Sequence, residues 1–579
     1  MLWVVLAAVG DSAPVVQLQG AGKVRGVGTA NGGAFFLSLP FAAPPVNEKR
    51  WLPPLPPLAW SGTIDASAFK PACAQVADWT GQPEPSIPGG GQGSEDCLYL
   101  DVYTPSLPGR RNKGPFAVVL FVHGGGFTGG DSAGGKIGPS GAHPGVPFST
   151  RFNGTFMAEA QQVVVVSINY RLGIFGFLGS QQLAAHAASA LGKPMGTGNL
   201  GIQDQRAAMA WVQKHIAAFG GDPTRVMIHG CSAGGVSIAN HMTQPLSWPY
   251  FTAAAMESGN QLTFTDAVSM ADAQASYDGL LGALGCSSLD CLLALNTSQL
   301  LTAPAHIDAS PVVDGVNLKD FPRRLLRAGQ VKHVPTIVGS ARDEVAGLMA
   351  DTLMEYANMT ADGFKHWLAT NYGAEHVMRM MQLYPPSSAR VGAAGGDCAG
   401  AKHDSNGCTL FYYLIVTIAS DDMVKCGARN VAQLLPSGMA YQYDWAYPNS
   451  PDGGSEPNAL TTNFVGHCSQ NPYDFGNTVR ASLVGGQAPA ITKLMSTAWA
   501  SLAKTGVPSH QWAAYSNSTD ASFVFGASVA ESGMAPNKKA QCDFLRWCRG
   551  DRTGHAPVAR HGQPPQLCTP TTPNPPPYP

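Results

Sequence analysis

The stretch Gly230-Cys231-Ser232-Ala233-Gly234 constrains the fold of this chain more than any other segment. A short apolar run, Val226–His229, precedes it, and a helix-permissive stretch, Gly235–Met242, follows it. Small residues two positions before and after Ser232 let the chain turn sharply from a strand into a helix, which lifts the serine Oγ above the sheet. A substrate carbonyl and a base can both reach the oxygen there, so Ser232 is the candidate nucleophile of an acyl transfer. A Gly-x-Ser-x-Gly pattern is common by chance in a chain with 67 glycines. The prediction therefore depends on finding the other residues that a catalytic serine needs.

A glycine loop upstream is the first partner. The sequence Phe121-Val122-His123-Gly124-Gly125-Gly126-Phe127 follows the apolar run Ala117–Leu120 and is typical of a strand that ends in a loop. Consecutive glycines leave backbone N–H groups unshielded, so the amides of Gly125 and Gly126, with that of Ala233, can surround a developing negative oxygen. A flexible turn or a phosphate-binding loop is the alternative. No Gly-Lys-Ser/Thr follows, however, and the spacing is not Gly-x-Gly-x-x-Gly.

An acid and a base are expected downstream of the serine, in that order. The strand-like run Val334–Gly339 is followed by a loop with two adjacent acids, Asp343 and Glu344, and either carboxylate can orient a base. Further along, His467 lies in a polar, turn-rich stretch after the strand-like Ala440–Trp445. Most of the 15 histidines are expected on the surface or in structural hydrogen bonds, but its order and loop context make His467 the candidate general base.

With these residues in place, the chain resembles the type-B carboxylesterases, the carboxylesterase/lipase family that includes the cholinesterases and several fungal lipases. The resemblance extends from about Gly20 to about Cys548. It also rests on the segments Ser94–Leu100, Asn169–Gly173, Gly198–Gln205 and Phe219–Pro223. It implies an α/β-hydrolase fold, in which a central, mostly parallel, twisted sheet is flanked by helices and helical insertions form an active-site gorge.

The resemblance also implies roles for the candidate residues. It assigns Ser232 as the nucleophile, Glu344 rather than Asp343 as the acid, and His467 as the base. Gly125, Gly126 and Ala233 are assigned to the oxyanion hole. The expected reaction is hydrolysis of a small-molecule carboxylic ester through an acyl-enzyme, without a metal or an organic cofactor. The cysteines show no paired Cys-x-x-Cys spacing and the histidines no His-Glu-x-x-His, so no metal site is predicted either.

The 12 cysteines suggest a set of disulfides. The resemblance suggests the pairs Cys73–Cys97, Cys286–Cys291 and Cys426–Cys542, whereas proximity alone suggests Cys398–Cys408 and Cys548–Cys568.

Two cysteines remain, Cys231 and Cys468. They adjoin the candidate nucleophile and the candidate base, which must lie within hydrogen-bonding reach of each other. Their Cα atoms can therefore lie within the span of about 4.4–6.8 Å that a disulfide needs. We hypothesise that they are bonded, an arrangement that locally resembles that of tannase-type feruloyl esterases. The alternative is two unconnected cysteines, one of them a small buried hydrophobe.

Composition and charge restrict the partners and the domain organisation. The 36 basic and 38 acidic residues nearly balance and no basic tract appears, so nucleic acid is not an expected partner. The candidate residues extend from position 232 to position 467 and must converge, so residues 14–548 are expected to form one unit. The oligomeric state stays open.

The ends of the chain suggest a secretory route. Residues 1–13 are typical of the apolar part of a signal peptide, although a basic segment is absent. The cysteines and the Asn-x-Ser/Thr sequons at Asn153, Asn296, Asn358 and Asn517 also fit a secreted glycoprotein. No apolar stretch of about 20 residues suggests a membrane span. The Pro-rich tail, 549–579, is expected to be disordered.

Two classes of function compete. One is an active serine ester hydrolase, which could be a broad carboxylesterase, a lipase or a feruloyl-type esterase. The other is a catalytically silent binding or adhesion protein built on the same fold. Silent relatives would show incomplete catalytic residues and a membrane-spanning segment after the domain, and this sequence shows neither.

Overall fold

The computed structural model describes residues 13–75, 93–109, 114–134, 152–260, 262, 267–304, 307–348, 356–388, 410–447, 464–477 and 487–548. The predicted disordered tail and all but the last residue of the predicted signal peptide lie outside these ranges. Cys398, Cys408 and Cys568 also lie outside them, so both pairings suggested by proximity stay predictions. No helix within the described ranges has the length and apolar character that crossing a membrane requires.

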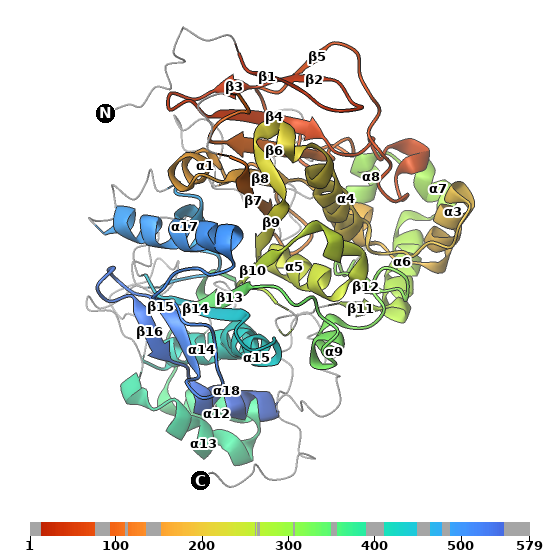
Figure 1. Cartoon of the computed structure of the whole chain (residues 1–579). Helices are drawn as coiled ribbons and strands as arrows, with labels where there is room; N and C mark the ends of the chain where they lie inside the picture. The colour runs from red at the N-terminus through yellow and green to blue at the C-terminus, as the bar shows by residue number, and fades with distance from the viewer. Residues whose placement is uncertain are drawn as a thin grey trace.

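A twisted sheet forms the centre of the molecule (Figure 1). Seven neighbouring strands, from β8 to β15, are parallel, and antiparallel strands complete both edges. In spatial order the 11 strands are β16 (Gly533–Pro536), β15 (Ala521–Phe525), β14 (Ala440–Trp445), β13 (Thr336–Ala341), β10 (Ala253–Glu257), β9 (Gly221–Cys231), β7 (Phe116–Val122), β8 (Val164–Ile168), β6 (Tyr99–Thr104), β4 (Ala34–Pro40) and β3 (Val27–Gly28).

Smaller sheets accompany the central one. β1 (Val15–Gln17), β2 (Lys23–Arg25) and β5 (Thr63–Asp65) form a three-stranded sheet, and β11 (Val268–Ser269) pairs with β12 (Val312–Val313).

Helices surround the central sheet (Figure 1). In the described ranges they are α1 (Thr155–Gln161), α2 (Gly173–Phe177), α3 (Gln181–Leu191), α4 (Leu200–His215), α5 (Ala233–Thr243), α6 (Met270–Leu284), α7 (Leu289–Ala294), α8 (Thr297–Leu301), α9 (Pro322–Arg327), α10 (Val345–Leu348), α12 (Ala361–Tyr372), α13 (Val377–Leu383), α14 (Leu410–Ser420), α15 (Cys426–Leu434), α16 (Asn471–Asp474), α17 (Ala488–Thr505) and α18 (Lys539–Cys548).

Both faces of the sheet are covered, which explains why its central strands are apolar throughout rather than alternating. Every residue of β7 is buried. Successive side chains of a strand point to opposite faces. Accordingly, Val118 and Leu120 lie in the core that α4 and α5 complete, whereas Val119 and Phe121 lie in the core that α17 completes. Figure 1 shows α17 on one side of the sheet and α4 and α5 on the other. The expected mostly parallel sheet with flanking helices is therefore confirmed.

Helical insertions add two further clusters. α12, α13, α14 and α18 share an apolar core beyond the C-terminal strands, and α2, α3, α6 and α7 share another. The gorge that such insertions are expected to form stays a prediction, because part of the chain around them lies outside the described residues.

Buried ion pairs fix the segments between these layers. Arg171 Nη2 lies 2.7 Å from Asp204 Oδ1, and the same guanidinium donates through Nη1 to the carbonyl oxygen of Leu52. Arg50 Nε lies 2.7 Å from Glu95 Oε2. Removing either partner would leave an uncompensated charge in the interior. Glu95, Arg171 and Asp204 lie in segments that carry the family resemblance, and the contacts of both pairs are those of a structural scaffold.

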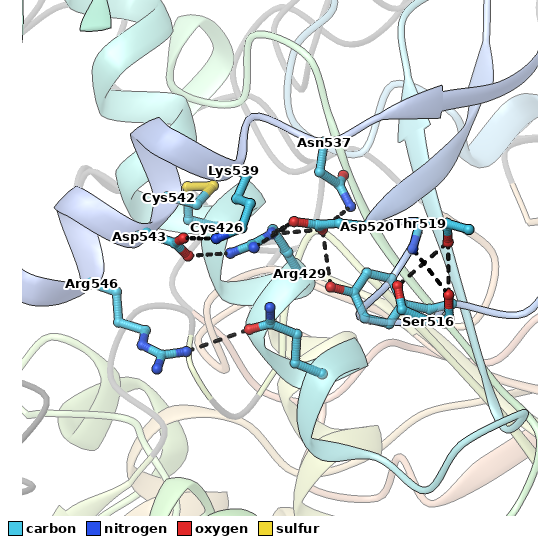
Figure 2. Close-up of polar contacts among 12 residues, drawn as sticks. Cys426, Arg429, Ser516, Thr519, Asp520, Asn537, Lys539, Cys542, Asp543 and Arg546 are labelled. Atoms are coloured by element: carbon cyan, nitrogen blue, oxygen red, sulfur yellow. Dashed lines mark hydrogen bonds and ion pairs between the residues drawn. A yellow bond between two sulfur atoms is a disulfide. The ribbon is translucent and has the colours of Figure 1, made fainter. Parts of the chain in front are cut away.

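The C-terminal part of the chain is held by a disulfide and a charged network, which Figure 2 shows. Cys426 at the start of α15 is bonded to Cys542 in α18. One turn further along α15, the guanidinium of Arg429 donates to Asp520 at 2.6 Å and to Asp543 at 2.8 Å. The bonds Cys73–Cys97 and Cys286–Cys291 are also present.

Candidate active site

Ser232 occupies the turn between β9 and α5. Its backbone has φ 60° and ψ −127°, a conformation that side-chain-bearing residues rarely adopt. Such strain costs about 1–3 kcal/mol and persists only where neighbouring contacts enforce it. Here the Ser232 amide donates to the carbonyl oxygen of Glu257 at 2.9 Å, and the Ser232 carbonyl accepts from Val236 N at 2.9 Å. The strand, sharp turn and helix predicted around the serine are all present.

Glycines make this turn possible through close backbone packing. A Cβ atom at Gly234 would overlap the carbonyl oxygen of Val122, and one at Gly259 would overlap that of Ser232. A Cβ atom at Gly124 would lie 2.9 Å from the Ser232 Cβ atom. The glycine loop after β7 therefore lies directly against the serine turn.

The predicted oxyanion residues lie in this loop and at the start of α5. Gly125 has φ 109° and Gly126 has φ 60°. The Gly125 carbonyl accepts from the amides of Thr128 and Gly129, whereas no hydrogen bond among the described residues uses the amide of Gly125 or Gly126 as a donor. Ala233 is the first residue of α5, so its amide has no acceptor within the helix. These donors are therefore available to an anionic oxygen.

His123 shapes the loop without taking part in the proposed chemistry. Its ring stacks on Tyr170 with 4.4 Å between centroids, and the Tyr170 hydroxyl donates to the His123 carbonyl at 2.9 Å. Burial lowers the pKa of His123. The ring is therefore neutral, and its Nδ1–H donates to the Gly124 carbonyl at 2.8 Å.

The structure separates the roles of the two adjacent acids. Glu344 is completely buried, accepts from the Ala341 amide through Oε1, and places Oε2 2.6 Å from His467 Nδ1. Asp343 instead accepts from the Val465 amide at 2.9 Å and pairs with the guanidinium of Arg342 at 2.8 Å. The carboxylate of Glu344 thus contacts the imidazole of His467. The carboxylate of Asp343 instead binds the backbone of the loop that carries His467.

A disulfide brings this loop to the serine turn. Cys231 and Cys468 are bonded, and their Cα atoms lie 6.1 Å apart, within the range expected from the sequence. The bond joins the residue before Ser232 to the residue after His467. The structure thus adopts the bonded alternative rather than two separate cysteines.

Polar residues behind the disulfide were not singled out from the sequence. His229 Nε2 lies 2.8 Å from Glu257 Oε1 and 3.2 Å from Asp474 Oδ2. The amide of Gln470 donates to Glu257 Oε2 at 3.0 Å and to Cys231 Sγ at 3.4 Å. These side chains come from three segments that are distant in the sequence, so the spacing of the residues along the chain does not predict that they meet. The only sequence clue is a histidine at the end of the apolar run Val226–His229.

Comparisons with known proteins identify the family of this chain. The carboxylesterase family model matches residues 12–545. The para-nitrobenzyl esterase of Bacillus subtilis is 29% identical over 90% of this chain and 96% of its own length. The fumonisin B1 esterase of Sphingopyxis macrogoltabida is 30% identical over 93% of this chain and 91% of its own length.

A solved structure supports the same assignment. The carboxylesterase of Geobacillus stearothermophilus superposes with a TM-score of 0.69 and 28% identity, covering 91% of this chain and 99% of the other. The fold, the family match over nearly the whole chain and these relatives lead to one conclusion: the chain belongs to the carboxylesterase family and is a carboxylic-ester hydrolase of the α/β-hydrolase fold.

Proposed function

We propose that this enzyme cleaves esters through an acyl-enzyme on Ser232, with His467 as the general base and Glu344 as the acid that orients it. The contact of 2.6 Å between Glu344 Oε2 and His467 Nδ1 carries the proposal. A carboxylate can accept hydrogen bonds but cannot donate them, so Nδ1 holds the proton and the lone pair of the neutral ring lies on Nε2. That is the tautomer a base needs in order to accept the proton of a serine.

Acylation follows from these positions. Ser232 Oγ attacks the ester carbonyl carbon while His467 Nε2 takes the hydroxyl proton. The negative oxygen of the tetrahedral intermediate accepts from the amides of Gly125, Gly126 and Ala233. Each such donor contributes about 3 kcal/mol to lowering the barrier. The protonated imidazole then donates its proton to the departing alcohol.

Deacylation follows the same steps, with water as the nucleophile. His467 takes a proton from water, the resulting hydroxide adds to the acyl carbon, and the collapsing intermediate returns the proton to Ser232 Oγ. Glu344 stabilises the imidazolium that forms in both halves of the reaction. None of these steps requires a metal or an organic cofactor.

We propose a small-molecule carboxylic ester as the substrate. The relatives named above are described as esterases of para-nitrobenzyl and fumonisin B1 substrates, so the family accepts chemically different esters. Lipase and feruloyl-type activities remain alternatives within the same chemistry, and the preferred acyl group, a long chain or an aromatic acid, separates them.

The test is hydrolysis of p-nitrophenyl acetate, butyrate and octanoate by the purified protein and by Ser232→Ala. We expect activity in the wild type and its loss in the variant, and a preference for the short acyl chains would identify a small-ester esterase. A preference for the octanoate ester, with a rate that rises once this ester exceeds its solubility limit, would instead identify a lipase. Equal inactivity of two folded proteins would favour the silent binding protein, and equal activity would refute Ser232 as the nucleophile.

We also propose that the enzyme follows the secretory route. The sequon residues Asn296, Asn358 and Asn517 are exposed, as N-glycosylation requires, and the cysteine pairs suit an oxidising compartment. Expression in a eukaryotic host tests this proposal. An active product in the medium whose mass falls on treatment with an N-glycosidase would support it, and an unglycosylated product retained in the cell would contradict it.

A further inference from the structure

The loop that carries His467 is attached to the serine strand in more than one way. The covalent attachment is the disulfide between Cys231 and Cys468. The second is Gln470, whose amide bridges Cys231 Sγ and the carboxylate of Glu257. The third is Asp474 in α16, whose Oδ2 lies 3.2 Å from His229 Nε2. His229 and Cys231 belong to β9, and Glu257 ends the neighbouring strand β10.

Strand geometry explains why these groups meet. β9 and β10 are parallel, with Cys231 beside Glu257 and His229 beside Ala255. Residues two apart in a strand share a face, so His229 and Cys231 point the same way. Glu257 lies next to Cys231 in the register and reaches both His229 and Gln470. The loop after His467 packs on this face and contributes Gln470 and Asp474.

The charges in this cluster are removed from solvent. The side chain of His229 is 1% exposed and those of Glu257 and Asp474 are completely buried. Burial alone would lower the pKa of His229, but the two carboxylates raise it to about 10, so the ring is an imidazolium at neutral pH. Burial and the charge of Glu257 raise the pKa of Asp474 to about 7. Ion pairs as buried as these cost desolvation energy and are weak evidence for stability alone.

We propose that His229, Glu257, Gln470 and Asp474 form a second, non-covalent anchor that acts in parallel with the disulfide to hold the loop of His467 against the strand of Ser232. These four residues are positioning residues, because they act through the loop and contact no reacting atom. The inference rests on the proposed function, since it assigns the anchor's purpose to the relative position of base and nucleophile.

A buried cation is the competing interpretation of the same cluster. One imidazole and two carboxylates are suitable ligands, and the nearest nitrogen and oxygen atoms of His229, Glu257 and Asp474 lie within 4.8 Å of one another. The contact of 2.8 Å between His229 Nε2 and Glu257 Oε1 has hydrogen-bond geometry, however. A carboxylate can only accept, so Nε2 carries a proton in this contact, and a metal ion would first have to displace that proton. We therefore favour the ion pair over a metal site.

Two parallel anchors predict a specific pattern in a double-mutant cycle. The cycle combines Cys231→Ala/Cys468→Ala, which removes the covalent anchor, with Asp474→Asn, which keeps the shape of the side chain but removes its charge. Cys231→Ala also removes the contact of Gln470 with Sγ, but the contacts of Gln470 with Glu257 and of Asp474 with His229 stay in place. Each change alone therefore leaves most of the other anchor intact, and kcat for p-nitrophenyl butyrate should fall only a few-fold, with KM unchanged. Together they should lower kcat about tenfold more than the product of the separate effects, a coupling typical of residues that share one network.

Controls separate positioning from folding. Gln470→Ala removes the bridge without removing a charge and should show the same coupling to disulfide loss if Asp474→Asn fails to fold. Cys286→Ala/Cys291→Ala removes a disulfide that adjoins none of the candidate catalytic residues, and its effect on kcat should multiply simply with that of Asp474→Asn. All rates are measured well below each variant's midpoint of thermal unfolding, where a change in stability alone does not alter kcat.

The outcomes are distinguishable. Simple multiplication of the two effects, or a change in KM alone, would overturn the second anchor while leaving Ser232 as the nucleophile. Stoichiometric metal in the purified wild-type protein, absent from Asp474→Asn by mass spectrometry, would replace the anchor by a metal site. Retained activity in Ser232→Ala would show that the proposed function itself is wrong.

Discussion

Glu344 Oε2 lies 2.6 Å from His467 Nδ1, both side chains are buried, and Cys468, the residue after His467, is bonded to Cys231. The adjacent Asp343 has the same charge, but it binds the loop backbone instead. We therefore predict different effects on activity when each carboxylate is substituted, even though the two residues are neighbours in the sequence.

Glu344→Gln should lower kcat by about 10³–10⁴-fold, because an amide can donate to Nδ1 and so favour the wrong tautomer of His467. Asp343→Asn should cause a much smaller loss, since it weakens only the contacts with Val465 and Arg342. Steady-state kinetics with p-nitrophenyl butyrate measure both. A larger effect of Asp343→Asn would show that the acid has been assigned to the wrong residue.

Reduction of the Cys231–Cys468 bond should lower activity before the protein unfolds. The bond joins the end of β9, next to Ser232, to the loop of His467, and neither cysteine belongs to the two apolar cores of the central sheet. Activity and near-UV circular dichroism followed together during titration with dithiothreitol test this, with thiols located by alkylation and peptide mapping. The Cys231→Ala/Cys468→Ala variant should be insensitive to the same titration. Full activity in protein whose Cys231 and Cys468 are both alkylated would contradict the prediction.

Gly234→Ala should abolish activity and destabilise the fold, because the added methyl group would overlap the carbonyl oxygen of Val122. Gly282→Ala is the matched control. Gly282 lies in α6, an added Cβ atom there would meet nothing within 4 Å, and alanine favours a helix over glycine by about 1 kcal/mol. The control should therefore keep its activity and unfold at a slightly higher temperature. Thermal unfolding and esterase assays distinguish the two, and an active, stable Gly234→Ala would refute the packing argument.

The parts of the site that could be predicted from the sequence are those that local chemistry determines. The turn at Ser232 depends on glycines within two residues of it, and the order of the acid and the base follows from the order of the strands. The Cys231–Cys468 bond could be inferred because each cysteine adjoins a residue whose position was already constrained.

The cluster of His229, Glu257 and Asp474 could not be predicted in this way. Its members contact one another only through the register of β9 and β10 and the packing of α16. The sequence also left Asp343 and Glu344 equivalent without the family resemblance, because the direction of a side chain depends on the backbone around it. In both cases tertiary packing supplies the missing information.

The network around Arg429 should make the C-terminal region sensitive to acid (Figure 2). Burial alone would raise the pKa of Asp520 and of Asp543. Hydrogen bonds and the charge of Arg429 lower both, with a further contribution from Lys539 at Asp543. A carboxyl group whose pKa is lower in the folded state adds stability above its unfolded pKa of about 3.9 and loses it as the pH falls below that value. The free energy of unfolding should therefore decline as the pH drops below about 4.

Arg429→Met tests this assignment, because it removes the cation while keeping most of the apolar volume. It should lower the free energy of unfolding near pH 7 by about 3 kcal/mol, the lower end for breaking a buried ion pair. The difference from wild type should narrow as the pH falls below about 4 and through the lower pKa values that Asp520 and Asp543 have in the folded wild type, because protonation then removes the charges with which Arg429 pairs. Urea unfolding of both proteins at pH 3, 4, 5 and 7 measures this difference in the free energy of unfolding. A constant difference across this range would mean that Arg429 stabilises the fold through packing rather than through its two carboxylate partners.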